Sequence, residues 1–285
     1  MKGLILAGGT GSRLFPLTQA ITKQLLPVFD KPMIYYPLSV LMLSGIDDIM
    51  IIVSPEDEPN FKRVLGNGEH FGISISYCIQ KKPTGIAEAF LLAESFLAGS
   101  PVTFILGDNI FYGHGVPQLI DDAQRNNTGA TLFGHYVNDP ERYGVAELAK
   151  DGKILSLVEK PTHPKSNIAV TGLYIYDEHV CEHAKRLVPS DRGELEITDL
   201  NNRYLESGQL SLSILGRGTA WLDTGTHESL FEASTFIQVL EQRQGLKVAC
   251  LEEIAFRQGF ITRDKLKARA SFFNNAYGEY LTKIA

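Results

Sequence analysis

The sequence is poor in cysteine and in long apolar runs. Its three cysteines, Cys78, Cys181 and Cys250, are far apart and form no CxxC pair. This spacing argues against a disulfide framework and against a zinc cluster, and it favours buried thiols. No apolar run approaches the roughly 20 residues that are needed to cross a bilayer, so we expect no membrane contact.

Positive charge and hydrolase motifs are also scarce. The chain has 27 Lys and Arg against 33 Asp and Glu, a formal net charge of -6 at pH 7. Without a basic stripe for a nucleic-acid backbone, we expect small molecules as partners and no nucleic acid. The seven histidines show no HxH or HExxH spacing, and neither Ser12 nor Ser39 stands in a GxSxG elbow. Metallohydrolase and serine-hydrolase chemistry are therefore not indicated.

A signal peptide is not evident either. Only Met1 and Lys2 precede the first apolar run, which leaves no room for the charged, apolar and cleavage segments of such a peptide. We therefore expect a cytoplasmic protein.

Short apolar runs alternate with segments of helical period through the first half of the chain. The expected strands are residues 3–7, 49–53, 73–79 and 102–106, and the expected helices are residues 33–43, 58–65 and 87–97. In the first of these helices apolar residues recur at helical spacing, and Gly45 follows as a helix stop. The alternation predicts an α/β fold, with a wound parallel sheet and helices on both of its faces.

The pattern changes after residue 108. The expected strands are then residues 130–136, 145–148, 153–158, 168–176 and 210–215, and a helix is expected over residues 195–205. The pair Asp151-Gly152 predicts a two-residue hairpin turn, which is typical of antiparallel strands. From Thr226 onward the sequence is almost wholly helical. We expect a single domain over residues 1–285, with an α/β core of about residues 1–225 and a helical C-terminal extension of about residues 226–285.

A glycine-rich loop follows the first expected strand. Gly8, Gly9 and Gly11 permit positive φ and close backbone approach, so that successive N–H groups can point at one anion. Leu14 stands where a GxGxxG dinucleotide fingerprint needs its third glycine, and no lysine-hydroxyl pair completes a Walker loop. The loop therefore predicts a phosphate site of another type.

Charged side chains follow this loop and a later strand. Arg13 offers a planar fork and Lys23 a compact ammonium, which together suit a polyphosphate and a leaving pyrophosphate. Asp108 comes directly after the expected strand 102–106, at the edge of the sheet where ligands bind. A carboxylate there favours Mg²⁺, which proteins hold with one or two carboxylates and phosphate oxygens. Asp223 is a candidate second ligand, although an aspartate in its sequence context also suits a turn or a helix cap.

Longer stretches carry a resemblance that spans nearly the whole chain. They are residues 6–18, 23–38, 106–114, 139–145, 159–161, 170–174, 192–201, 220–227 and 243–261. Together they resemble the sugar-1-phosphate nucleotidylyltransferases, and within them the branch that joins dTTP to glucose 1-phosphate. The resemblance implies a Rossmann-like wound mixed sheet of the nucleotide-diphospho-sugar transferase type, with a β-rich sugar-binding half and C-terminal helices.

The resemblance also implies the roles of individual residues. The implied catalytic residues are Arg13, Lys23 and Lys160, and the implied Mg²⁺ ligands are Asp108 and Asp223. The implied nucleotide-binding residues are Gly8, Gly9, Gly11, Gln24, Gln80, Gly85 and Asp108. The implied sugar-phosphate-binding residues are Tyr143, Gly144, Glu159, Lys160, Val170, Thr171 and Glu194.

The segment that would recognise the base contains Gln80 and Gly85. A glutamine amide both donates and accepts hydrogen bonds, which suits the edge of thymine or uracil. The segment differs from the pattern PDGLAQAF that the family suggests, because Thr84 stands for Asp and Glu88 for Gln. Because Gln80 and Gly85 are both present, the resemblance implies a pyrimidine nucleotide.

The implied reaction joins dTTP and α-D-glucose 1-phosphate to give dTDP-glucose and pyrophosphate, the first step of dTDP-L-rhamnose and deoxysugar biosynthesis. The resemblance further implies a homotetramer and a second site for feedback by dTDP-L-rhamnose, with the candidate residues Tyr112, Gly113, Arg217, Glu253 and Arg257. Two alternatives stay open. One is transfer of a uridylyl or other nucleotidyl group, or transfer to another hexose 1-phosphate; the other is a nucleotide-sugar sensor without catalysis.

Overall fold

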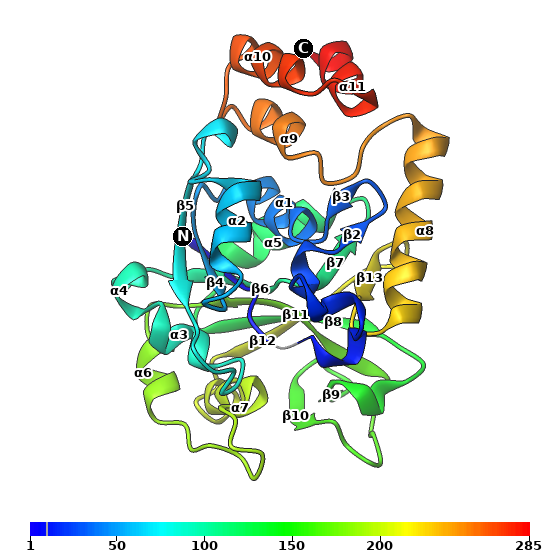
Figure 1. Cartoon of the computed structure of the whole chain (residues 1–285). Helices are drawn as coiled ribbons and strands as arrows, with labels where there is room; N and C mark the ends of the chain where they lie inside the picture. Colours follow the sequence, from blue (N-terminus) through cyan, green and yellow to red (C-terminus); the bar gives the residue numbers. More distant parts are fainter. Residues whose placement is uncertain (10) are drawn as a thin grey trace.

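The computed structural model describes residues 1–9 and 11–285, and its centre is a nine-stranded mixed sheet (Figure 1). The strands of this sheet are β1 (Lys2–Leu6), β4 (Asp48–Val53), β5 (Ser74–Ile79), β6 (Val102–Leu106), β8 (Ala130–Tyr136), β9 (Gly144–Leu148), β10 (Ile154–Glu159), β11 (Ile168–Tyr176) and β12 (Leu210–Ile214). Their main order is β10-β9-β11-β6-β1-β4-β5, while β8 pairs with β11 and with β12. The mixed wound sheet confirms the predicted fold class.

The first half of the chain forms a run of four parallel strands, and β12 pairs parallel with β8 in the second half. β1 lies between β4 and β6, and β5 extends the parallel run on the far side of β4. Ile5 lies opposite Ile51 and Ile105 in these ladders, and all three side chains are fully buried. Such continuous apolar strands are typical of a parallel sheet that is covered on both faces.

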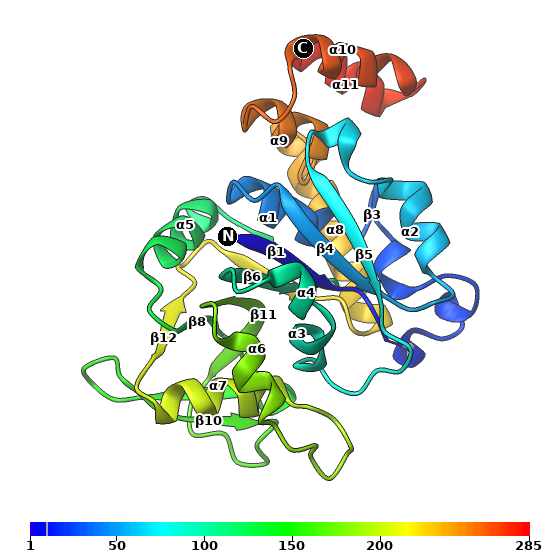
Figure 2. The same ribbon diagram turned by 90° about the vertical axis from the view of Figure 1, so that its left-hand side faces the viewer.

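Helices cover both faces of the sheet, as the alternation of strands and helices predicted (Figure 2). One buried cluster joins the sheet to α1 (Tyr35–Leu43), α2 (Glu58–Leu65) and α5 (Val116–Asn126). A second cluster lies on the other face and joins it to α3 (Glu88–Leu92), α4 (Glu94–Leu97), α6 (Val180–Lys185) and α7 (Ile197–Glu206). The carboxyl ends of β1 and β6 open between these two layers, where the candidate site lies.

Two local predictions were wrong in detail. The expected helix 87–97 is divided, because the backbone at Ala93 (φ −89°, ψ 3°) leaves the helical region between α3 and α4. The β9–β10 hairpin has a three-residue loop rather than a two-residue turn, since Ala149 N–H donates to the carbonyl oxygen of Lys153 at 2.8 Å. Gly152 ends this loop with φ 85°, a conformation that favours glycine.

Helices form the regular structure that follows the last strand. They are α8 (His227–Gln244), α9 (Leu251–Arg257), α10 (Arg263–Phe272) and α11 (Ala276–Ile284). α8 begins with a capping box, in which Thr226 accepts from Ser229 N–H at 3.2 Å and Thr226 N–H donates to Ser229 Oγ at 3.0 Å. In both views α10 and α11 lie at the opposite end of the molecule from β10 (Figures 1 and 2). Within the described residues, every helix is too short or too polar to span a membrane.

Candidate active site

Two short strands that the sequence analysis missed bring the two predicted metal ligands together. β7 (Asn109–Tyr112) pairs antiparallel with β13 (Ala220–Asp223), and Asn109 lies opposite Asp223. Just beyond this ladder, Thr224 donates to the carbonyl oxygen of Asp108 from its N–H at 3.2 Å and from its hydroxyl at 2.8 Å. Asp108 and Asp223 are therefore neighbours in the fold, although 115 positions separate them in the sequence.

Asp108 has partners on both carboxylate oxygens. Lys23 forms an ion pair with Oδ2, and Asn109 Nδ2 donates to Oδ1 at 3.0 Å. Burial alone would raise the pKa of Asp108, but the charge and hydrogen bond of Lys23, with the bond from Asn109, hold that pKa below its ordinary value of 3.8. Asp108 is therefore a fixed negative charge at neutral pH.

The pKa of Asp223 is shifted in the opposite direction from that of Asp108. Burial, and next the negative charge of Asp108, raise the pKa of Asp223 above its ordinary value, against the opposing charges of Lys23 and Arg13. A divalent cation between two such carboxylates would relieve their repulsion, and their oxygen donors suit a hard cation. Within residues 1–9 and 11–285, groups of three or more His, Cys, Asp or Glu that could hold a metal are absent. The residues therefore fit a metal that phosphate oxygens and water help to hold.

The glycine loop and its cations line a cavity beside these carboxylates. Gly9 and Gly11 have φ of 109° and 57°, so both occupy the region that favours glycine. A Cβ added at Gly225 would lie 3.3 Å from Nη2 of Arg13 and 3.3 Å from Oδ1 of Asp223, so these side chains converge over it. The cavity has a volume of about 200 Å³ and is lined by Gly9, Gly11, Ser12, Arg13, Leu14, Lys23 and Gly225. The structure thus brings the predicted polyphosphate residues together.

A second part of the same region contains the predicted base-binding residues. Gln80 follows β5 and is only 5% exposed, and a Cβ added at Gly8 would lie 2.5 Å from its Oε1. Gln24 lies on the other side of the loop, where its Nε2 donates to the carbonyl oxygen of Gly8 at 3.5 Å. Gln80, Lys81 and Pro83 line a cavity of about 340 Å³ that also shares Gly9 with the polyphosphate cavity. The two cavities therefore adjoin at Gly9.

Gly85 is held against the backbone of a distant loop. The backbone carbonyl oxygen of Thr84 accepts from Leu195 N–H at 2.7 Å. Ala87 N–H donates to the carbonyl oxygen of Leu195 at 3.1 Å. A Cβ on Gly85, whose φ is 115°, would lie 2.4 Å from both the nitrogen and the oxygen of Leu195. This approach also places the neighbouring Glu194 near the base segment, and its Oε2 lies 3.8 Å from Nη2 of Arg192, which lines the cavity at Glu159 and Lys160.

Gly85→Ala is expected to lower the free energy of unfolding by about 2 kcal/mol or more, since strain at positive φ adds to the clash with Leu195. The measurement is urea unfolding followed by circular dichroism. Gly99→Ala is the matched control, because Gly99 has φ 73° and no neighbouring atom within 4 Å of an added Cβ. Equal losses in the two variants would contradict a role for the contact with Leu195.

The predicted sugar-binding residues lie mainly at the start of β9, at the end of β10 and in the first half of β11. Gly144 and Glu159 are opposite each other in the β9–β10 ladder, and a Cβ on Gly144 would lie 3.4 Å from Oε2 of Glu159 and 3.9 Å from Cβ of Val170. Thr198 of α7 donates to Oε2 of Glu159 at 2.6 Å. Glu159 is therefore oriented by one partner and keeps further acceptor positions for a ligand.

Lys160 and Thr171 complete this group. Lys160 has φ 43°, donates its backbone N–H to the carbonyl oxygen of Tyr143 at 3.0 Å, and places Nζ 3.5 Å from Oε1 of Glu159. The hydroxyl of Thr171 is buried without a partner in the described part of the chain. A cavity of about 460 Å³ is lined here by Glu159, Lys160, Ser190, Asp191, Arg192, Glu196 and Asp199. Its acidic and basic side chains suit a polar ligand.

The sequence analysis assigned no role to Asn109 or Trp221. Asn109 Oδ1 accepts from Trp221 Nε1 at 2.6 Å and from Gly172 N–H at 3.1 Å, while its amide nitrogen bonds Asp108. The Trp221 ring also packs on Tyr143, with 5.0 Å between the ring centroids. These two side chains therefore connect the predicted metal ligand Asp108 to Tyr143, one of the predicted sugar-binding residues. The only signal in the sequence was their position beside Asp108 and near Asp223.

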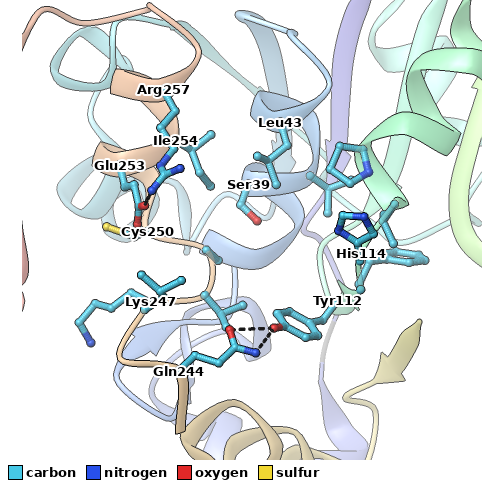
Figure 3. Close-up of a pocket in the computed structure, with 18 of the residues that line it drawn as sticks. Ser39, Leu43, Tyr112, His114, Gln244, Lys247, Cys250, Glu253, Ile254 and Arg257 are labelled. Carbon is cyan, nitrogen blue, oxygen red and sulfur yellow. Dashed lines mark hydrogen bonds and ion pairs between the residues drawn. The ribbon is translucent and has the colours of Figure 1, made fainter. Parts of the chain in front are cut away.

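A separate cavity contains most residues that were predicted for a second site. It has a volume of about 420 Å³, and its lining includes Tyr112, Gly113, Glu253 and Arg257. Figure 3 shows Glu253 and Arg257, which pair at 2.7 Å, across the cavity from Tyr112 and His114. Arg217 is not in its lining and lies in the β12–β13 loop. Four of the five residues are therefore brought together.

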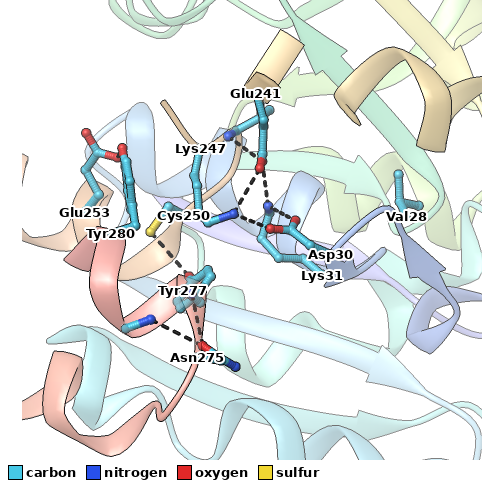
Figure 4. Close-up of polar contacts among 12 residues, drawn as sticks. Val28, Asp30, Lys31, Glu241, Lys247, Cys250, Glu253, Asn275, Tyr277 and Tyr280 are labelled. Carbon is cyan, nitrogen blue, oxygen red and sulfur yellow. Dashed lines mark hydrogen bonds and ion pairs between the residues drawn. The ribbon is translucent and has the colours of Figure 1, made fainter. Parts of the chain in front are cut away.

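An ionic cluster, in which Lys31 and Glu241 are buried, adjoins this cavity (Figure 4). Lys31 and Lys247 each pair with both Asp30 and Glu241, and the distances to Glu241 are 2.8 and 3.0 Å. Burial alone would raise the pKa of Asp30, but the bonds from Lys247 and Lys31 hold that pKa below its ordinary value. The cluster joins α8 and the segment after it to the hairpin of β2 (Pro27–Val28) and β3 (Lys31–Pro32).

The fold and the site define the class of this protein. The nucleotidyl transferase family model matches residues 2–239, and the chain belongs to that family. This match agrees with the predicted class, the sugar-1-phosphate nucleotidylyltransferases, and the chain is a transferase. Enzymes of this class generally use a divalent metal ion, which agrees with the pair Asp108 and Asp223.

Closer relatives give the particular group. Glucose-1-phosphate thymidylyltransferase of Neisseria meningitidis is 56% identical over 285 residues, covering 100% of this chain and 99% of that protein. The Mycobacterium tuberculosis protein of the same name is 50% identical, with the same coverage. A Bacillus anthracis protein assigned to this activity, solved with sucrose, has a TM-score of 0.76 and 46% identity over 83% of this chain and 94% of that one. The predicted resemblance is confirmed.

Proposed function

We propose that the chain transfers a thymidylyl group from dTTP to α-D-glucose 1-phosphate, with Mg²⁺, and releases dTDP-glucose and pyrophosphate. The observation that carries the proposal is the convergence of Arg13, Lys23, Asp108 and Asp223 beside the glycine loop. The thymidylyltransferase relatives, which match the full length of the chain, support the choice of nucleotide and sugar.

The proposed chemistry requires alignment and charge stabilisation rather than a general base. The phosphate of glucose 1-phosphate is already ionised at neutral pH, and one of its oxygens attacks the α-phosphorus of dTTP in line with the departing pyrophosphate. Arg13, at the polyphosphate cavity, would stabilise the charge that develops on the leaving group. Lys160 would hold the attacking phosphate, because its ammonium lies beside Glu159 in the sugar pocket. Asp108 and Asp223 would hold Mg²⁺, which neutralises phosphate charge when it is bound.

The sugar ring would be recognised mainly by Glu159 and by the backbone at Gly144. A carboxylate accepts hydrogen bonds from two hydroxyl groups at once, and Thr198 occupies only one of its acceptor positions. The absence of a side chain at Gly144 lets a ligand approach the peptide group. Val170, Thr171, Tyr143 and Glu194 would complete this pocket, with Glu194 beside Arg192 at its rim.

The decisive test is pyrophosphate release with glucose 1-phosphate and each of dTTP, UTP, CTP, ATP and GTP, first with Mg²⁺ and then with EDTA. We expect the highest kcat/KM with dTTP and loss of activity in EDTA. Equal or better use of UTP would favour a uridylyltransferase, and preference for another hexose 1-phosphate would change the acceptor. Absence of release with every pair, together with measurable dTTP binding, would favour the sensor.

We also propose a second, regulatory nucleotide-sugar site in the cavity between Tyr112 and Arg257 (Figure 3). Glu253 and Arg257 offer polar contacts there, and dTDP-L-rhamnose as a feedback inhibitor would be the ligand. A cytoplasmic homotetramer at the start of deoxysugar biosynthesis, built from one domain over residues 1–285, remains part of the same proposal.

A further inference from the structure

The side chain of Gln80 has a charged neighbour that fixes its orientation. Its Nε2 lies 2.7 Å from Oε2 of Glu88, the first residue of α3. An ionised carboxylate only accepts hydrogen bonds, whereas an amide donates from nitrogen and accepts at oxygen. The nitrogen of Gln80 therefore faces Glu88, and the amide oxygen faces away from it.

The amide oxygen faces the glycine loop. A Cβ added at Gly8 would lie 2.5 Å from Oε1 of Gln80, so this oxygen packs against the glycine loop, and Gln80 itself lines the cavity that contains the predicted base-binding residues. Because Gln80 is only 5% exposed, water does little to screen its dipole. The group presented to a bound base is consequently an acceptor, with the remaining N–H of the amide beside it.

Pyrimidine bases differ at the edge that would meet this amide. Thymine and uracil carry a donor at N3 and an acceptor at O4, whereas cytosine carries an acceptor at N3 and an amino donor at C4. In the same pose, cytosine would require the amide of Gln80 to turn over. The turned amide would place its oxygen against the Glu88 carboxylate, and two facing acceptors without a proton between them are unfavourable in a buried site.

We propose that Glu88 is a positioning residue that holds Gln80 in the orientation that accepts N3–H, and that it thereby selects thymine and uracil nucleotides against cytosine nucleotides. The inference rests on the proposed function, since it deepens the choice of base. Glu88 itself touches no reacting atom. A glutamine at position 88 would accept or donate, so it would support either orientation of Gln80.

The test compares kcat/KM for dTTP, dUTP and dCTP in the wild-type enzyme and in Glu88→Gln. We expect the ratio of dTTP to dCTP to fall about tenfold, the cost of one unfavourable buried polar contact. The ratio of dTTP to dUTP should not change, because their edges are alike. Glu94→Gln is the matched control, because Glu94 pairs with Lys185 on the exposed surface.

An unchanged ratio of dTTP to dCTP in Glu88→Gln would overturn the proposal. If that variant fails to fold, Glu88→Ala provides the same comparison, because alanine also removes the acceptor and suits the first turn of a helix. Calorimetric binding of dTTP and dCTP to the protein without sugar is the second readout. If the wild-type protein releases no pyrophosphate with dTTP, the proposed function fails, while the binding ratios still decide whether Glu88 orients Gln80.

Discussion

Asp108→Asn is expected to lower the turnover of dTTP with glucose 1-phosphate by about 10²-fold or more, the scale seen when one electrostatic stabiliser is lost. The substitution keeps the size of the side chain but removes its charge. It leaves the ammonium of Lys23 without its ion partner and leaves Asp223 as the only carboxylate for the metal. Steady-state pyrophosphate release at saturating substrates is the measurement, and the Mg²⁺ concentration for half-maximal rate should rise.

The control for this prediction is Asp48→Asn. Asp48 begins β4, at the end of the strand away from the site, and its partly exposed carboxylate pairs with Lys2 at 3.2 Å. Exposed ion pairs contribute little, so this variant should keep wild-type turnover. A near-normal kcat in Asp108→Asn would remove Asp108 from the mechanism.

Much of the fold could be predicted because its signals are local. The strand 102–106 and the helix 58–65 have the predicted bounds, since each is delimited by a change of hydrophobic period within a few residues. β7 and β13 could not be found in this way. Each has only four residues, and their partners lie about 110 positions apart. Such a ladder is specified by tertiary packing, and a short apolar stretch alone does not identify it.

How much of the site could be predicted also depends on whether its residues are close in the sequence. Gly9, Gly11 and Arg13 lie within five consecutive positions of the sequence, so their chemistry could be predicted as a group. The proximity of Asp108 and Asp223 could be predicted only through resemblance, because the ladder that joins them is not local. Contacts of a single atom, such as Nε2 of Gln80 on Glu88, depend on packing between elements. The sequence shows that both residues are present, but it does not show how an amide is turned.

The ionic cluster around the buried pair Lys31 and Glu241 carries the largest expected effect on stability. Glu241→Ala should lower the free energy of unfolding by about 3–5 kcal/mol, the range for breaking a buried ion pair from one side. Lys31, only 2% exposed, would keep Asp30 alone as its counterion, which Lys247 also shares. The N–H of Val248 would also lose its acceptor, which is Oε1 of Glu241 at 2.9 Å. Urea unfolding followed by circular dichroism measures the change.

Glu232→Ala is the matched control, because Glu232 is exposed on the same helix, α8. The loss in Glu241→Ala should exceed the loss in Glu232→Ala by at least about 2 kcal/mol, since surface substitutions usually stay within about 0.5 kcal/mol. The buried lysine is the physical cause of this difference.

Lys31→Met with Glu241→Leu removes one charge of each sign together, and it should recover part of the loss because no lysine is then left buried beside too few carboxylates. Equal stability of Glu241→Ala and Glu232→Ala would show that water reaches the cluster and screens its charges.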